Sequence, residues 1–157
     1  MKPENINLLQ PTKYAVSFPE VTEAVYFCQE ANIPGVSLGA ATHVTPNLDL
    51  YVSGTKMVYN AFSMTFLVNE DISAWLTIHN WIKELSSADL SYKNRTKKQA
   101  TLTVYSNLNN PKLRIKYSNI YPMSLSDLQF DTKQSAEDHI TATASFRYDF
   151  FEIEKID

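Results

Sequence analysis

The strongest pattern in this chain is an alternation of apolar and polar side chains close to its C-terminal end. One set of alternate positions is apolar or aromatic: Ile140, Ala142, Ala144, Phe146, Tyr148 and Phe150. The positions between them hold Thr141, Thr143, Ser145, Arg147 and Asp149. Because successive side chains of a β-strand point to opposite faces, this period of two predicts a strand with one buried and one solvated face. Its eleven residues exceed the usual strand length of about 5 to 6, which suits a sheet that continues across subunits.

Shorter stretches with the same period predict a mainly antiparallel β fold. They lie at residues 13–18, 48–52, 101–104 and 113–117. A turn signal at residues 109–111 separates the last two and predicts a paired hairpin. Residues 25–30 predict another strand, which ends at Pro34 and Gly35, because proline lacks a backbone donor and glycine permits positive φ.

Residues 56–68 predict a strand that is apolar on both faces. One face carries Val58, Phe62, Met64, Phe66 and Val68, and the other carries Met57, Tyr59, Ala61, Ser63, Thr65 and Leu67. A strand with one face in bulk water does not need apolar side chains on that face. We therefore expect the helix or another subunit to cover the second face.

Residues 70–86 predict the single helix of the chain. Trp75, Ile78, Ile82 and Leu85 recur at spacings of three and four, which places them on one apolar stripe that a sheet must cover. A side chain at Asn69 or Asp71 can accept a bond from the free amides of the first turn. The expected fold class is therefore mainly β, an antiparallel barrel or sandwich with one α-helix packed on the sheet.

The length of 157 residues fits one domain that spans residues 1–157. Residues 1–12 are polar, contain two prolines and predict an N-terminal arm. Residues 36–55, with the three glycines of the chain at or near their ends, predict a long hairpin or loop. Residues 87–99 predict a polar basic loop, for which we favour a solvated surface over a contact with phosphate or another subunit. Its basic side chains are Lys93, Arg95, Lys97 and Lys98.

No motif in the chain points to catalysis, a cofactor or a metal. The one cysteine, Cys28, cannot close an intrachain disulfide and is expected to be a buried structural residue. His79 is expected to pack beside the apolar stripe of the helix, and His43 and His139 offer no ligand spacing with it. The sequence contains no glycine-rich phosphate loop and no nucleophile elbow. We therefore predict that the protein is not an enzyme and needs no cofactor, metal or small-molecule substrate.

The net charge and the hydropathy of the sequence argue against two kinds of partner, nucleic acid and membrane. The net charge of −3 and the isoelectric point near 5.6 argue against tight nucleic-acid binding, which depends on clustered Lys and Arg. No apolar run reaches the roughly 18 residues of a membrane-spanning helix, so we predict no membrane anchor. Residues 1–10 lack the layout of a signal peptide.

Taken in order, the elements resemble the tail tube proteins of contractile-tailed bacteriophages, a family that includes baseplate-proximal relatives. The resemblance covers nearly the whole chain, and the order and spacing of its pieces carry it. These pieces are the strand at residues 13–18, Ile33-Pro34-Gly35, Leu50-Tyr51-Val52-Ser53-Gly54, Asn69-Glu70-Asp71 ahead of the tryptophan-bearing helix, Ile120-Tyr121-Pro122, and Asp149-Phe150-Phe151. Residues 36–46 and 86–99 depart from the family pattern.

The resemblance implies a structural virion protein, a tail tube subunit of stacked homohexameric rings that form the conduit for DNA ejection. It also implies contacts with other tail, baseplate or sheath proteins, transient passage of DNA through the lumen, and assembly in the host cytoplasm. The acidic net charge fits such a channel. The residues predicted to form oligomer contacts are Leu38, Leu48, Leu50, Val52, Met57, Tyr59, Tyr121 and Phe151.

Two alternatives remain open from the sequence. The first keeps the fold but places the subunit at the baseplate or neck as a ring adaptor. The second is a monomeric β-barrel that holds a small apolar ligand among its aromatic side chains.

Overall fold

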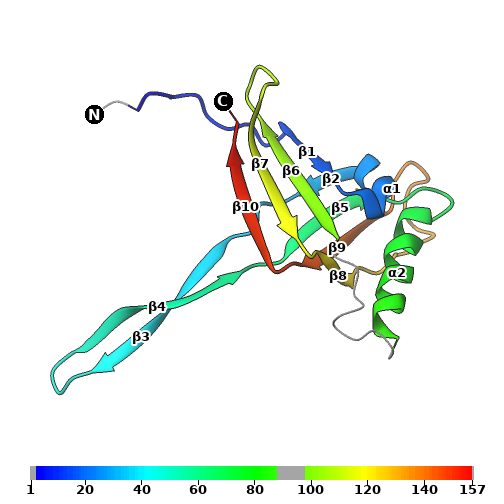
Figure 1. Cartoon of the computed structure of the whole chain (residues 1–157). Coiled ribbons are helices and arrows are strands. Elements are labelled where there is room, and N and C mark those ends of the chain that lie inside the picture. The colour runs from blue at the N-terminus through cyan, green and yellow to red at the C-terminus, as the bar shows by residue number, and fades with distance from the viewer. Residues whose placement is uncertain (1–2, 88–97, 157) are drawn as a thin grey trace.

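The computed structural model of the chain describes residues 3–87 and 98–156. These residues form two four-stranded antiparallel sheets, two α-helices and a long two-stranded hairpin that projects from the body (Figure 1). The prediction of a mainly antiparallel β fold is confirmed. Most of the predicted basic loop at residues 87–99 lies outside the described residues.

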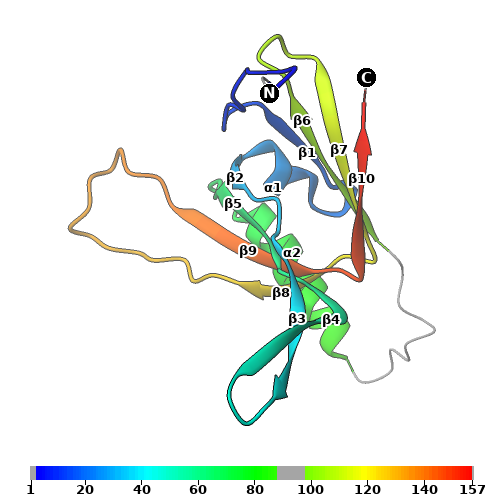
Figure 2. The same ribbon diagram turned by 90° about the vertical axis from the view of Figure 1, so that its left-hand side faces the viewer.

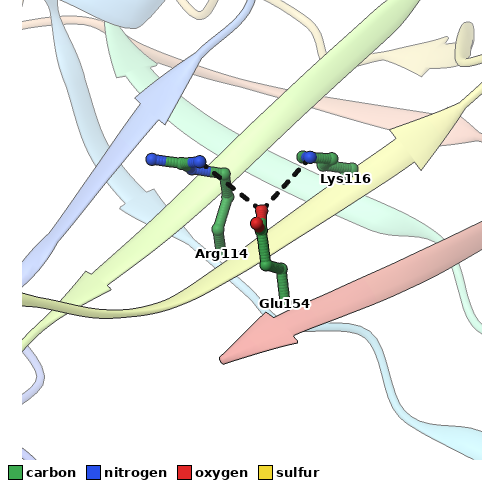
Figure 3. A network of polar contacts seen from close by, with 3 residues as sticks. All are labelled: Arg114, Lys116 and Glu154. Carbon is green, nitrogen blue, oxygen red and sulfur yellow. Dashed lines mark hydrogen bonds and ion pairs between the residues drawn. The ribbon is translucent and has the colours of Figure 1, made fainter. Parts of the chain in front are cut away.

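The first sheet has the strand order β1-β6-β7-β10. Its strands are β1 (Tyr14–Ser17), β6 (Gln99–Tyr105), β7 (Pro111–Ser118) and β10 (Phe150–Lys155), and every neighbouring pair is antiparallel. The predicted hairpin between the two central strands is present as β6 and β7. Glu154 on the edge strand β10 forms ion pairs with Lys116 at 3.2 Å and Arg114 at 3.5 Å on β7 (Figure 3). These two cations, Lys116 first, lower the pKa of Glu154, but the exposed network adds little stability because water screens it.

The second sheet has the strand order β2-β5-β9-β8. Its strands are β2 (Cys28–Ala31), β5 (Phe62–Leu67), β9 (Thr141–Arg147) and β8 (Tyr121–Leu125), again antiparallel throughout. The face of β5 and β9 that points into the molecule is fully apolar. It carries Phe62, Met64, Phe66, Ala142, Ala144 and Phe146, each at most 1% exposed.

The core lies between the two sheets and is closed at one end by α2 (Ser73–Ser86). Tyr117 of β7 packs on Phe62 at 5.0 Å between ring centroids, which joins the first sheet to the second. Trp81 of α2 packs edge-on against Phe18 at 5.9 Å. Aromatic contacts of this kind add to the stabilisation that burial itself gives, so the helix is fixed to the sheets by rings.

The helix α2 begins at Ser73, three residues later than the predicted start at residue 70, and ends at Ser86 as predicted. Asn69 Oδ1 accepts a bond from the Ser73 backbone N–H at 3.2 Å, and Ile72 adopts a left-handed conformation with φ 55° just before the first turn. Ala74 and Ile78 are buried on the stripe that faces the core. His79 is exposed and stacks on Trp75 with 5.3 Å between ring centroids, so it is less buried than expected.

Residues 25–30 do not form one strand as predicted. Pro19 opens a short 3₁₀ turn, η1 (Pro19–Val21), which leads into the helix α1 (Thr22–Tyr26), and β2 starts only at Cys28. Val21 and Ala24 are buried on the same side at 2% and 0% exposure. Their spacing of three residues is helical, and it outweighs the strand propensity of Val25 and Tyr26.

The strand predicted at residues 56–68 is two strands. The first part belongs to the projecting hairpin and ends at Tyr59. Asn60 and Ala61 lie outside both strands, and β5 begins at Phe62. Val58, predicted to share a buried face with Phe62, is therefore 45% exposed. Except for Tyr59, which packs against the core, the apolar side chains just before Asn60 are exposed.

The long strand predicted at residues 140–150 also divides. β9 ends at Arg147, and the Asp149 N–H donates to the Ser118 carbonyl at 3.0 Å, which brings the chain into the first sheet as β10. Tyr148 is still buried at 8% exposure, whereas Phe150 is 43% exposed. The length of that alternation therefore gives no support to a sheet that extends across subunits.

The register of β9 makes a direct test of the core possible. We expect Ala144→Asp to lower the free energy of unfolding by about 4 kcal/mol or more, because Ala144 is 0% exposed opposite Met64 and an isolated carboxylate cannot be solvated there. The neighbouring Thr143→Asp should cost less than about 1 kcal/mol, because Thr143 is exposed. Denaturant unfolding followed by circular dichroism measures both. Equal tolerance at the two positions would show that the register is wrong.

Candidate assembly interface

The element that stands out from the body is the hairpin of β3 (Val36–Val44) and β4 (Asp49–Tyr59). Among residues 3–87 and 98–156 its two strands pair only with each other, so they form a separate two-stranded sheet. In two perpendicular views the hairpin extends away from both four-stranded sheets (Figures 1 and 2). An isolated two-stranded hairpin is at best marginally stable in water, so this element needs support from another surface.

The hairpin exposes far more apolar surface than a free element should. Its large apolar side chains that are at least 45% exposed are Val36, Leu38, Val44, Leu48, Leu50, Tyr51, Val52, Met57 and Val58. Contiguous exposed apolar surface of this kind on a soluble protein marks an interaction site. No other described segment concentrates so many.

The two strands approach each other very closely near the middle of the hairpin. The register shifts between Leu38 and Ala40, where Gly39 faces the region of Gly54. A Cβ atom on Gly54 would lie 2.3 Å from the Gly39 carbonyl oxygen, whereas a Cβ on Gly39 would meet nothing within 4 Å. Only glycine at position 54 therefore permits this close approach of the two strands.

The root of the hairpin is held by side chains from the corner between β9 and β10. Arg147 Nη1 donates to the Tyr59 carbonyl at 3.1 Å, and the Tyr148 hydroxyl donates to the Asn60 carbonyl at 2.7 Å. Burial raises the pKa of Tyr148 to about 12, so its hydroxyl remains a donor. The Tyr59 ring packs on Phe151 at 5.2 Å. The root is therefore fixed to the body, while in the part of the chain that the structure describes the outer strands pair only with each other.

A compact turn closes the far end of the hairpin. The Thr45 N–H donates to the Leu48 carbonyl at 3.2 Å, and the Leu48 N–H donates to Thr45 Oγ1 at 3.1 Å. The Thr45 hydroxyl also contacts the Leu48 carbonyl. These bonds hold the turn in shape and leave the Leu48 side chain 63% exposed.

The predicted contact residues gather mainly on this hairpin. Leu38, Leu48, Leu50, Val52 and Met57 lie on it with their side chains exposed, and Tyr59 is partly buried at its root. The remaining two lie elsewhere: Tyr121 is 38% exposed on β8, and Phe151 is partly buried against the core on β10. Val36, Val44, Tyr51 and Val58 are exposed beside the predicted residues and were not identified from the sequence. Their apolar character on both strand faces was the available signal.

The described surface offers little for small-molecule chemistry. A depression beside α1 and α2, lined by Glu20, Thr22 and Thr77 among others, has a volume of about 70 Å³, well below the roughly 300 Å³ at which ligand pockets begin. No group of His, Cys, Asp or Glu within residues 3–87 and 98–156 is arranged to hold a metal ion. None of the described helices combines the length and apolar character that crossing a membrane requires. Cys28 is half-buried, which raises the pKa of its thiol.

Comparison with known proteins identifies a family and a relative by sequence. The family model described as phage tail tube protein matches residues 7–154. The tail tube terminator protein of Enterobacteria phage T4 is 27% identical to this chain over 161 residues, which cover 95% of this chain and 90% of that protein.

Solved structures share the fold at low identity. A chain in the six-fold symmetrised structure of the anti-feeding prophage baseplate has a TM-score of 0.67 at 10% identity, covering 99% of this chain and 98% of its own. A chain in the sheath/tube terminator structure of an extracellular contractile injection system, PVC, has a TM-score of 0.63 at 13% identity, covering 96% and 99%. At these identities the likeness establishes a common fold.

The close approach of Gly54 to Gly39 gives a prediction with a matched control. Gly54→Ala should disrupt the pairing of β3 with β4, because its Cβ would collide with the Gly39 backbone, and should leave the core intact. Gly39→Ala places a Cβ in open space and should be tolerated. Hydrogen exchange should show about tenfold or greater loss of protection at hairpin amides in Gly54→Ala only. Equal protection in both variants would mean that the close approach is not required.

Proposed function

Because the chain belongs to the phage tail tube protein family, we propose that it forms the ring that terminates the tail tube of a contractile-tailed phage. Membership of this family makes the protein a structural component of the phage tail and not an enzyme. The observation that carries the proposal is the sequence likeness to the T4 tail tube terminator over 95% of this chain. That likeness includes the hairpin as well as the body.

The fold likeness alone does not choose between positions in the tail. Chains of this fold occur in a baseplate, in a sheath-tube complex and in terminators. A shaft subunit needs two complementary faces so that rings stack without limit, whereas a terminator needs one such face toward the tube. The hairpin supplies one projecting apolar face, which is what contact with a tube end requires.

A ring of identical copies follows from the open edges of the sheets. In the single chain, β1 and β10 leave the two edges of the first sheet open, and β2 and β8 those of the second. Open edges invite pairing, and head-to-tail contacts that close into a ring remove them. We take six copies from the six-fold symmetry of the anti-feeding prophage baseplate that contains a chain of this fold.

The remaining partners follow from this position. DNA passes through the lumen without being held, in agreement with the net charge of −3. Other tail proteins, including a tube and a sheath, contact the ring from outside. A layer at the baseplate is the second candidate, because a chain of this fold also occurs in the anti-feeding prophage baseplate.

The capping activity can be measured with purified components. The protein is added to growing tubes of the tail tube protein from the same phage, and tube lengths are measured by electron microscopy. We expect tubes to become shorter as the proportion of this protein rises, with one labelled layer at one tube end. The same amount of extra tube protein, as the control, should lengthen them.

Three outcomes would contradict the proposal that the protein is a tube terminator. Long tubes formed by this protein alone would identify a shaft subunit. Attachment to baseplates and not to free tube ends would identify a baseplate layer. A strictly monomeric protein at high concentration would rule out a ring that assembles by itself.

A further inference from the structure

The arm predicted at residues 1–12 is described from residue 3 onward, and all of its described side chains are exposed. Three of them are large and apolar: Ile6 is 64%, Leu8 is 85% and Leu9 is 69% exposed. Figure 1 shows the arm leading from β1 away from the sheets. Apolar side chains are costly to keep in water, so the arm needs a surface that covers them.

The backbone of the arm is ready to pair. Asn5, Ile6, Asn7 and Leu8 alternate polar and apolar side chains, which is the pattern of a strand. The Asn7 N–H donates to Asn5 Oδ1 at 2.9 Å. Neighbouring N–H groups of an extended chain point to opposite sides, so those of Ile6 and Leu8 lie on the other side. Within residues 3–87 and 98–156, no backbone hydrogen bond reaches either of these two residues.

The strand β10 offers an edge to which such a segment can bind. In the described chain β10 pairs with β7 on one side and with no strand on the other. Beyond the end of β10, the Ile156 N–H donates to the Lys112 carbonyl at 2.8 Å. Hydrogen-bonded and non-hydrogen-bonded pairs alternate along an antiparallel ladder. The backbone groups of Ile153, three residues earlier, therefore point away from β7 toward the open edge.

The side chain of Ile153 gives this edge an uncovered apolar position. Ile153 pairs with Ile115, which is 0% exposed, so its side chain lies on the core side of the sheet. It is nevertheless 59% exposed. Residues that pair in the same way with buried residues on the other three edge strands are partly buried: Val16, Ala31 and Leu125. The edge of β10 therefore lacks a cover that the other edges have.

We infer that residues 5–8 of the arm add as a strand to the open edge of β10 in a neighbouring copy of the chain, with Ile6 and Leu8 beside Ile153. This inference rests on the proposed function, because the ring supplies the neighbouring copy. In strand addition, backbone hydrogen bonds give affinity and alternate side chains give specificity. Both are available here.

The position of the arm favours a neighbouring copy over its own chain. The arm leads into β1, and β10 is the opposite edge strand of the same sheet, with β6 and β7 between them. Figure 2 shows the arm on the β1 side, apart from β10. A contact between opposite edges of identical copies is head-to-tail, and such contacts form a ring when the rotation closes.

Cysteine cross-linking between differently substituted copies tests this contact. All copies carry Cys28→Ser, which removes the one native thiol. Copies with Ile6→Cys or Leu8→Cys are mixed with copies with Ile153→Cys, assembled and oxidised. We expect at least one mixture to give a cross-linked dimer on a non-reducing gel, because paired residues of adjacent strands lie within disulfide reach. In the matched control, Asn7→Cys faces the other side of the strand and should give about tenfold less dimer.

Aspartate variants test whether the contact contributes to the ring. Leu8→Asp should raise the concentration needed for ring formation by about tenfold or more, because its carboxylate would be buried against Ile153. Asn7→Asp carries the same charge on the other face and should raise that concentration by about twofold or less. Sedimentation measures ring formation. Circular dichroism should show the same fold for both variants, because the arm buries no side chain in the single chain.

Four results would overturn the inference. Cross-linking within single chains of Ile6→Cys/Ile153→Cys at high dilution would place the arm on its own chain. Cross-linking of the arm to Met123→Cys on β8, and not to Ile153→Cys, would place it on the second sheet. Equal ring formation by Leu8→Asp and the wild type would remove the contact while leaving the proposed function intact. If the wild type forms no rings, the proposed function fails as well.

Discussion

The side chains of Arg147 and Tyr148 join the three parts of the molecule. They stand where the chain leaves β9 in the second sheet and turns toward β10 in the first, and both donate hydrogen bonds to carbonyls at the root of the hairpin. The Tyr148 ring also contacts Tyr117 at 5.0 Å and Tyr59 at 5.9 Å. Because Tyr148 is 8% exposed and its ring packs on the buried Tyr117, core packing helps to set the direction in which the hairpin leaves the body. The hairpin is thus a projection whose root is bonded to the body and whose outer strands pair with each other.

This arrangement puts stability and assembly on different residues. The core uses the rings and alanines between the sheets, with Phe62, Phe146 and Ala144 all at 0% exposure. The hairpin contributes nothing to that core beyond Tyr59 and remains costly to expose to water. The core is thus formed within one chain, while the hairpin presents an exposed apolar surface of the kind that marks an interaction site. The low identity of 10% to a chain of the same fold is consistent with this division, since many sequences can fill such a core.

Much of the body could be predicted from the sequence, because period and burial agree there. The register of β9, the pair of β6 and β7, and the stripe of α2 all follow from side-chain spacing. The errors arose where the chain passes from one sheet to another without interrupting the alternation. Tyr148 is buried although it follows the last residue of β9. The alternation of apolar and polar residues therefore continues to Phe150 although the strand ends at Arg147. Asn60 marks a similar break before Phe62, and no proline or glycine signals it.

The hairpin explains why the interface was only partly predictable. The sequence pattern of an apolar strand residue does not show whether the residue contacts the core or another subunit. Leu50, which is exposed, and Phe151, which packs on the core, were therefore both predicted to be contact residues. What separates the two cases is the pairing of β3 with β4 in a sheet of its own, apart from both four-stranded sheets. The local periodicity of the sequence does not indicate this separate pairing. The alternation at residues 48–52 would therefore be the same whether that strand joined a sheet of the body or, as here, belonged to the projecting hairpin.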